Sequence, residues 1–557
     1  MNNRIMSSLA VLGLVAIGLV GCGGGSSTPP TPPPVKTQNF VFSVLGVALN
    51  DGGHTPYDIA GVVSIATDGS GKVSGGVQDY SDGNGIASPQ PRGDTITGGT
   101  LTTQTEGLGT LTLITNNAKL GVGGTETFAV AFSNANHALI SQFDGSATSS
   151  GSLDLQTSVA LPTGAYSFVA SGSGFNEEAV VDGGVLTVDG SGNITGTGDL
   201  NDGGEVTRGT SIPAGAMLSA PNAFGRGTIT TNTILFGTVN YYTVNSKVFR
   251  MVETELGSTA VGSAYSQGAT PNFANSDIGP SVFSLGEGFA FYGAAGELTT
   301  NAVAAARSRT SVSPETGSTN IFTGVGDLND LNHSPLLAES ISGTYNLAAN
   351  GYGTMTFNAS GGGPGFGSVV TLGLYAVDPT IDLLDVNDTT NASGGVLLAE
   401  MDENLPGAGL LIAQTDTTLA DFSGSFTFGA GGLTGAPAGF DFVGESTISA
   451  GVFSGTGAVS DPFGALTPQA GEFSAIAFAA TAEADETHAG RFTLAPWALS
   501  GNGISGTVNT TYTAYQANSV QAFIVQMDSI IESHGTIQQS TFTASAATQL
   551  RSRPEKH

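Results

Sequence analysis

A fourfold internal repeat constrains the fold of this sequence more than any other feature. The segment ITGTGDLND at 194–202 returns 128 residues later as FTGVGDLND at 322–330, and FSGTGAVSD at 453–461 is a weaker copy. In the first repeat the matching stretch is the turn and strand start at 68–75, which resembles 189–196. Copies of this length are hard to ascribe to composition, so one structural unit recurs along the chain.

A second motif is a strand led by glycine, in which Thr alternates with a large apolar residue. Such a period of two is expected for a strand with one buried face, so we expect Thr to point to solvent. The copies are GTLTL at 109–113, GTITT at 227–231, GTMTF at 353–357 and a degenerate GRFTL at 490–494.

A third motif keeps the same spacing in all four copies: an apolar strand, an acidic residue, and a glycine seven positions later. The residue two before the acid is polar and shares its strand face. These pairs predict either a polar patch in a barrel mouth that orients a small ligand, or simply a strand end that meets water. The four pairs are Gln142 and Asp144, Glu253 and Glu255, Glu400 and Asp402, and Gln526 and Asp528.

Eight short strand-like runs fall between Phe40 and Gln156, separated by turns rich in Gly, Asp, Asn and Ser. This pattern predicts an all-β fold of about four tandem antiparallel β-meander units, each an up-and-down barrel or a sandwich. An alternative is that neighbouring units share one sheet. The expected ranges are 38–158, 161–269, 272–417 and 418–545, followed by a tail at 546–557.

Charge narrows the range of partners. The 557 residues include 15 basic and 45 acidic ones, which gives a net charge of −30. Nucleic acid is therefore not an expected partner, because phosphate binding depends on Lys and Arg. Anionic lipid headgroups would also repel such a surface.

The N-terminus carries Arg4, an apolar run, and then Leu19-Val20-Gly21-Cys22, which contains the only cysteine. The apolar run is shorter than the roughly 20 residues that a spanning helix needs. This segment resembles a bacterial lipoprotein signal peptide with its lipobox. The resemblance implies cleavage after residue 21, attachment of lipid such as palmitate at Cys22, and a Gly/Ser/Pro-rich tether at 22–37. Gly23 in place of aspartate favours the outer membrane.

The ectodomain is similar to β-rich repeat lipoproteins of bacteria, a resemblance that carries no activity with it. The six histidines are scattered singly and suggest surface or loop positions. Aspartate-rich segments such as 79–82, 199–202, 327–330 and 385–388 raise the possibility of calcium, but their spacing favours ordinary turn chemistry. We expect no catalytic residues, no metal and no cofactor.

Three functions follow as hypotheses. The first is a lipid-anchored surface interaction, adhesion or structural protein of the cell envelope, in which several similar sites gain avidity. The second is a carrier or sensor that holds a small apolar ligand in each eight-stranded unit. A remote third is an envelope hydrolase, since paired carboxylates are plentiful.

Overall fold

The computed structural model describes most of the chain beyond Val35. The described residues are 36–49, 55–82, 93–104, 106–174, 178–231, 239–254, 258–287, 292–301, 320–331, 333–359, 369–403, 406–434, 439–462, 464, 471–501, 503–529 and 531–542. The chain divides into two units, Met1–Val35 and Lys36–His557. The expected signal peptide, Cys22 and all but the last two residues of the tether lie outside the described residues, as do Glu255 and the tail.

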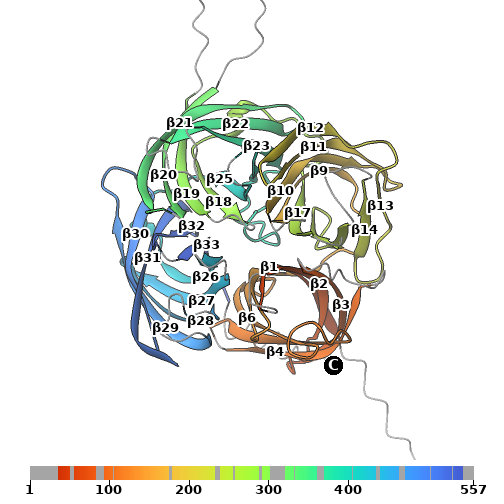
Figure 1. The fold of residues 1–557 in the computed structure, drawn as a ribbon, viewed down its shortest axis with the longest axis horizontal. Helices are drawn as coiled ribbons and strands as arrows, with labels where there is room; N and C mark the ends of the chain where they lie inside the picture. The colour runs from red at the N-terminus through yellow and green to blue at the C-terminus, as the bar shows by residue number, and fades with distance from the viewer. Residues whose placement is uncertain are drawn as a thin grey trace, which may run out of the picture. The chain divides into compact units, whose positions relative to one another are not determined.

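The second unit is all-β and consists of four tandem antiparallel sheets, one from each sequence repeat (Figure 1). This confirms the predicted fold class. Among the described residues no strand pairs with a strand of another repeat, so the alternative of shared sheets is wrong. We name the parts repeat 1 (37–155), repeat 2 (164–266), repeat 3 (281–413) and repeat 4 (424–539).

Repeat 1 is a closed up-and-down barrel in which consecutive strands pair and the last strand pairs with the first. The eight strand-like runs of the sequence are all present as strands. They are β1 (Thr37–Ala48), β2 (Thr55–Ala66), β3 (Val73–Asp82), β4 (Asp94–Thr103), β5 (Leu108–Thr115), β6 (Thr125–Asn134), β7 (His137–Phe143) and β8 (Ala147–Leu155).

Repeat 2 is a curled sheet of nine strands that stays open between β12 and β13. An isolated bridge between Asn193 and Met217 is the pairing seen across that gap. Its strands are β9 (Gly164–Ser173), β10 (Ala179–Val188), β11 (Ile194–Asp202), β12 (Glu205–Ser211), β13 (Met217–Leu218), β14 (Arg226–Thr230), β15 (Val239–Thr243), β16 (Val248–Glu253) and β17 (Thr259–Ser266).

Repeats 3 and 4 are again closed barrels of eight strands. The strands of repeat 3 are β18 (Ser281–Glu287), β19 (Tyr292–Asn301), β20 (Asn320–Asp330), β21 (Leu336–Leu347), β22 (Tyr352–Ala359), β23 (Val370–Val377), β24 (Gly395–Glu400) and β25 (Ala408–Ala413). Those of repeat 4 are β26 (Gly424–Thr434), β27 (Gly439–Ser449), β28 (Val452–Asp461), β29 (Gly471–Ala484), β30 (Arg491–Gly501), β31 (Ile504–Asn518), β32 (Gln521–Gln526) and β33 (Ile531–Gln539).

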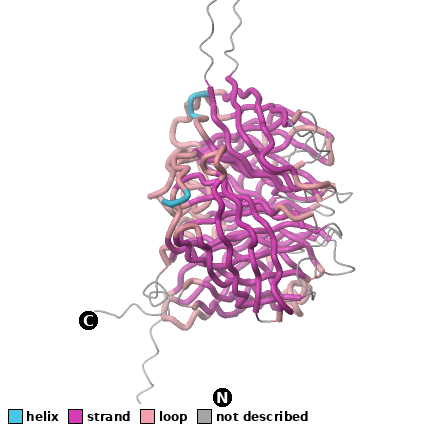
Figure 2. The backbone as a smooth tube through the Cα atoms, turned by 90° about the vertical axis from the view of Figure 1, so that its left-hand side faces the viewer, coloured by secondary structure: helices cyan, strands magenta, loops and turns pink. Residues whose placement is uncertain are grey.

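Helical structure in the described part is limited to two 3₁₀ turns, η2 (Asn275–Asp277) and η3 (Leu419–Asp421), shown in cyan in Figure 2. No helix there is long and apolar enough to cross a lipid bilayer.

Alternation along the strands puts large apolar side chains inside each barrel. In β5, Leu111 and Leu113 are fully buried while Thr110 and Thr112 remain partly exposed, as the glycine-led motif predicts. In repeat 4 the sole tryptophan, Trp497, lies inside the barrel with its ring stacked 5.0 Å from that of Phe478. Aromatic and aliphatic side chains of this kind fill the interiors, which is the usual condition of barrels with about eight strands.

The turns that join the strands follow from local chemistry. In the turn before β3, the carboxylate of Asp68 accepts a hydrogen bond from the backbone N–H of Ser70 at 2.9 Å. Gly71 has a φ of +62°, and a Cβ there would lie 2.0 Å from the carbonyl oxygen of Leu101. Only glycine therefore suits this position.

Candidate functional site

The four repeats form a closed ring in which each contacts the next and repeat 4 contacts repeat 1. Cross-repeat packing joins β2 to β17, β10 to β23, β19 to β33 and β8 to β27. Figure 1 shows the repeats following one another around a common centre. We call the four contacts seams 1–2, 2–3, 3–4 and 4–1.

Seam 1–2 contains a buried aspartate of one repeat held by side chains of the next. Arg226 Nε donates to Asp79 Oδ2 at 2.6 Å, and its Nη2 donates to Oδ1 at 2.9 Å. The hydroxyl of Tyr242 donates to Asp79 Oδ2 at 2.6 Å. Burial raises the pKa of Tyr242 well above its usual range, so it stays a donor. A bidentate guanidinium–carboxylate pair of this kind fixes orientation as well as contact.

Seams 2–3 and 3–4 repeat this arrangement. In seam 2–3, Asp199 accepts from the hydroxyls of Tyr352 at 2.7 Å and Tyr375 at 2.8 Å. In seam 3–4, Asp327 accepts from Arg491 Nε and Nη2, both at 2.8 Å, and from the hydroxyl of Tyr515 at 2.5 Å. The three aspartates stand at the same place in the first sequence motif, three residues before a second aspartate.

The aspartate-rich segments are therefore not all turns, contrary to the prediction. Asp79, Asp199 and Asp327 lie within strands β3, β11 and β20, and their partners come from the following repeat. A turn prediction uses only neighbours in sequence, whereas these carboxylates are satisfied by residues more than 145 positions away. Of the four segments only 385–388 forms a turn, closed by Asp388 N–H on the carbonyl of Asp385 at 2.9 Å.

A second contact of the seams explains the asparagine in the same motif. The side-chain amide of Asn201 donates to the carbonyls of Glu400 at 2.9 Å and Asp402 at 2.8 Å. Asn329 does the same to Gln526 and Asp528, at 2.8 and 2.9 Å. The first motif of one repeat thus binds the backbone of the third motif of the next, and the repeated sequence positions encode the joints between barrels.

In seam 4–1, alanine stands in place of both the seam aspartate and the seam tyrosine. Ala458 stands where the other repeats have the seam aspartate, and Ala131 stands where they have the seam tyrosine, 11 residues before Gln142 as Tyr242 is before Glu253. Both alanines are buried in one small apolar cluster. Loss of a buried carboxylate and its donor together leaves neither partner unsatisfied, so at this position the seam is closed by apolar packing.

The segment after β33 makes a backbone hydrogen bond across seam 4–1. The linkers that follow the last strands of repeats 1 and 3 make the same kind of bond across seams 1–2 and 3–4. Thr541 N–H donates to the carbonyl of Ser133 at 2.7 Å. Thr157 N–H donates to Val244, and Thr415 N–H donates to Ala517, also at 2.7 Å. Beyond it, the ring of Phe542 stacks on Phe132 with centroids 5.4 Å apart.

The polar pairs of the third motif serve mainly as strand caps. Asp144 accepts from Gln142 Nε2 at 3.1 Å and from Thr127 N–H at 2.9 Å. Asp528 accepts from Gln526 Nε2 at 2.9 Å and from the backbone N–H of Thr511 in the neighbouring strand β31 at 3.3 Å.

In repeat 3, Asp402 accepts from Thr371 N–H at 3.2 Å, and Glu400 accepts from the hydroxyl of Tyr292. Burial raises the pKa of Glu400 well above its usual range. Glu253 is partly buried at the end of β16. None of these residues lines the cavity described next, and their assignment to a ligand stays a prediction.

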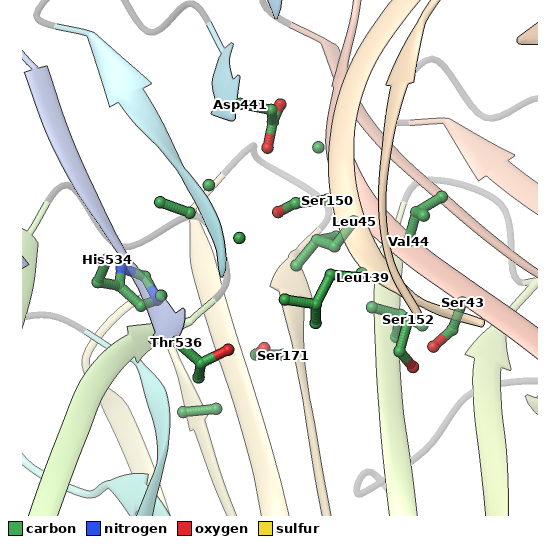
Figure 3. Close-up of a pocket in the computed structure, with 18 of the residues that line it drawn as sticks. Ser43, Val44, Leu45, Leu139, Ser150, Ser152, Ser171, Asp441, His534 and Thr536 are labelled. Carbon is green, nitrogen blue, oxygen red and sulfur yellow. The ribbon is translucent and has the colours of Figure 1, made fainter. Parts of the chain in front are cut away.

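A cavity of about 310 Å³ lies where all four repeats meet. We call it the central cavity. Its lining comes from the first and the last two strands of repeats 1, 2 and 3, and from β26, β27 and β33 of repeat 4. Figure 3 shows Leu45 and Leu139 beside the hydroxyls of Ser150 and Ser152, with His534 on another side. The surroundings therefore combine an apolar majority with a few polar groups, as small-molecule sites do.

The loop between β23 and β24, residues 378–394, adds Leu383 and Leu384 to the lining. This central loop bonds to the other three repeats. The side-chain amide of Asn387 donates to the carbonyl of Leu155 at 3.3 Å, Asn245 donates to the carbonyl of Val386 at 3.2 Å, and Gln521 donates to Asp382 at 2.6 Å. Repeat 3 thus supplies a segment that fastens the ring from its centre.

Two residues of the lining, Arg250 and His137, form a triad with Asp154 across seam 1–2. Asp154, fully buried, receives Arg250 Nη2 at 2.6 Å and His137 Nδ1 at 2.7 Å. Although Asp154 is buried, these two partners hold its pKa well below the usual range. For His137, burial lowers the pKa, but the charge of Asp385 and the bond to Asp154 outweigh it and leave the pKa raised.

His137 was expected on the surface or in a loop and is instead 1% exposed in β7, so that prediction is wrong for this residue. The sequence held one weak signal, because His137 lies on the third-motif strand five residues before Gln142. No sequence motif points to Arg250. Its only sequence signal is that it is one of 15 basic residues and sits inside an apolar strand.

Two carboxyl groups, Asp441 and Glu532, also line the central cavity. Burial raises the pKa of Asp441 to about 7, and hydrogen bonds from Thr148 and Ser150 counter this only in part. Burial raises the pKa of Glu532 as well, against its contact with His534. Among the described residues no group of three or more His, Cys, Asp or Glu side chains is arranged to hold a metal ion.

Comparison with known proteins identifies no family. No family model matches the sequence. No curated protein matches it either. The solved structures found include the ferric citrate transporter FecA in its unliganded form, with 10% identity, coverage of 90% of this chain and 78% of that one, and a TM-score of 0.11. Another is OpdQ of Pseudomonas aeruginosa, with 7% identity, coverage of 90% and 96%, and a TM-score of 0.10. Scores this low carry no inference about fold or function.

Proposed function

We propose that this protein is a lipid-anchored component of the bacterial cell envelope that acts by surface interaction, as a rigid multivalent scaffold. One observation carries the proposal: four related β repeats, three of them closed barrels, are joined into one body by seams that reuse the same sequence positions. A rigid body of this kind presents similar outer faces several times. Several weak contacts made at once then gain avidity that no single barrel has.

The lipobox-like Leu19-Val20-Gly21-Cys22 supports the anchoring part of the proposal. A net charge of −30 bears on the partner. Such a surface would repel anionic headgroups and polyanions, so the fitting partner is a neutral or basic envelope or extracellular polymer, or a protein surface. The proposal assigns no reaction to the chain.

The carrier hypothesis placed a ligand inside each barrel. Eight-stranded barrels are present, but the described side chains fill their interiors with clusters such as Phe42, Phe128 and Ile140 in repeat 1. We therefore prefer the scaffold. A ligand within a barrel would require these packed side chains to move, which is costly in a close-packed interior.

Two measurements test the proposal. Metabolic labelling with a palmitate analogue should modify the full chain and leave a Cys22→Ala variant unmodified. Labelled Lys36–His557 should bind intact cells or isolated envelope polymers, with an unrelated acidic protein of similar net charge as the control. Retention no better than the control on cells, matrix and envelope polymers would overturn the interaction role, whatever the outcome of the labelling.

A further inference from the structure

We propose that the central cavity binds a small carboxylate with an apolar body, whose carboxylate end meets Arg250 and His137. This goes beyond the scaffold role, because it assigns a ligand to the place where the repeats join.

The first support is the unused bonding capacity of two buried groups. Arg250 Nε and His137 Nε2 are buried and have no hydrogen-bond partner among the described residues. Both residues line the central cavity. A guanidinium Nε always carries a hydrogen, so it requires an acceptor. Leaving such a donor unsatisfied in a buried site costs more free energy than a typical hydrogen bond returns.

The second support is the way the remaining atoms of Arg250 are held. Its Nη1 donates to Ser263 at 2.6 Å, and its Nη2 donates to Asp154 at 2.6 Å and to Ser152 at 3.1 Å. The guanidinium is therefore fixed in direction before any ligand arrives. A preorganised donor of this kind loses little entropy on binding.

The hydrogen-bond donors at the triad favour an anion over a cation. In direct contact, the two basic side chains Arg250 and His137 share the single carboxylate of Asp154. The raised pKa of His137 favours the protonated ring, in which Nε2 is a second donor. Asp385 also faces the imidazole, and its charge balances that of the protonated ring. The preference for an anion therefore rests on Arg250 Nε and His137 Nε2, two buried donors that need an acceptor.

The two other carboxyl groups of the lining do not cancel this preference. Burial raises the pKa of both Asp441 and Glu532, which reduces the negative charge that they carry at a given pH. Figure 3 places Ser152, which Arg250 contacts, away from Asp441 and His534. A carboxylate at the triad would thus lie apart from them.

Apolar side chains fit the rest of the ligand. Leu45, Leu139, Leu397 and Leu410 come from four strands of repeats 1 and 3, and the central loop adds Leu383. A volume of about 310 Å³ lies at the low end of the range for ligand sites, which suits a short aliphatic chain. Octanoate is a probe of this size and chemistry.

The experiment is isothermal titration of Lys36–His557 with octanoate, 1-octanol and octylammonium. We expect octanoate to bind at least about tenfold more tightly than octanol, since a hydrogen bond to a charged group is worth about that much. Octylammonium should bind more weakly still. Equal affinity for octanoate and octanol, or preference for octylammonium, would overturn the proposal.

Variants locate the site. Arg250→Lys keeps a positive charge beside Asp154 but removes Nε. His137→Asn keeps a hydrogen-bond donor to Asp154 but removes Nε2. Each variant should lower the affinity for octanoate about tenfold. Ser171→Leu should fill the cavity and abolish binding, while Ser454→Leu on the exposed face of β28 should leave it unchanged. Since each variant is checked by circular dichroism, unchanged affinity in folded Ser171→Leu, or no binding by the parent chain, refutes the site.

Discussion

The hydroxyl of Tyr515 in repeat 4 donates a hydrogen bond to Asp327 in repeat 3 at 2.5 Å, across seam 3–4. In seam 4–1 the corresponding positions are two alanines, Ala131 and Ala458. Three seams use the polar form and one uses the apolar form. A buried carboxylate with its donors and a packed apolar pair are both satisfied solutions, whereas half of either is not. The seam residues should therefore tolerate paired replacement better than single replacement.

Asp327→Ala should destabilise the protein strongly. The change removes the acceptor of two Arg491 nitrogens and leaves a guanidinium that is only 8% exposed without its main counter-charge. Breaking a buried pair in this way costs about 3–5 kcal/mol. Urea unfolding followed by tryptophan fluorescence measures the loss, because Trp497 lies in the adjoining barrel.

Asp485→Ala is the matched control, since Asp485 binds the remaining Nη1 of Arg491 at 2.8 Å from a more exposed position. It should cost less than half as much. Equal losses for the two variants would contradict the special role of the seam aspartate.

The eight strands of repeat 1 and the order of the repeats could be predicted from the sequence because both depend on local patterns, whereas the nine strands of the open repeat 2 could not. The alternation of Thr with Leu111 and Leu113 specifies a strand with one buried face, and glycine-rich turns separate the strands. The seams could not be predicted, because Asp79 finds its partner 147 residues away in Arg226. The site was missed for the same reason: His137 and Arg250 acquire their meaning only when two repeats bring them to one carboxylate.

Glu126 should make the protein less stable as the pH rises. It lies inside repeat 1, where burial raises its pKa to about 8 despite a hydrogen bond from Gln78. The folded state thus holds a proton that the unfolded chain releases near pH 4.5, the ordinary value for glutamate. Stability from this group is fully present below about pH 4.5 and is lost towards pH 8, by about 1.4 kcal/mol per pH unit.

Glu126→Gln should flatten this dependence, because the amide has the shape of the protonated acid and does not titrate. Urea unfolding of the variant and the parent at pH 5 and pH 8 gives the comparison, with exposed Glu483→Gln as control. The prediction is contradicted if the free energy of unfolding of the parent, relative to that of Glu126→Gln, increases from pH 5 to pH 8.

Phe542→Ala should loosen seam 4–1. Phe542 stacks on Phe132 and belongs to the core cluster of repeat 1, although it follows the last strand of repeat 4. Removing a buried phenylalanine ring costs about 3–5 kcal/mol. Amide hydrogen exchange should rise first in β6, where Ser133 accepts the hydrogen bond of Thr541.

The control for seam 4–1 is truncation after Phe542, which keeps every described contact of that seam. It should leave exchange in β6 unchanged. If the truncation loosens β6 as much as Phe542→Ala does, the aromatic contact is not what closes the ring.

Asp385→Asn should lower the pKa of His137. Burial alone would depress that pKa, and the charge of Asp385 is the largest opposing influence, ahead of the hydrogen bond to Asp154. The amide retains the shape of the side chain and removes the charge, so the imidazole should lose its proton at lower pH. Titration of the histidine ring by NMR measures the shift directly, with Asp388→Asn in the same loop as the control. A pKa of His137 that stays in place, or rises, would show that the central loop does not contribute to the charge of the triad.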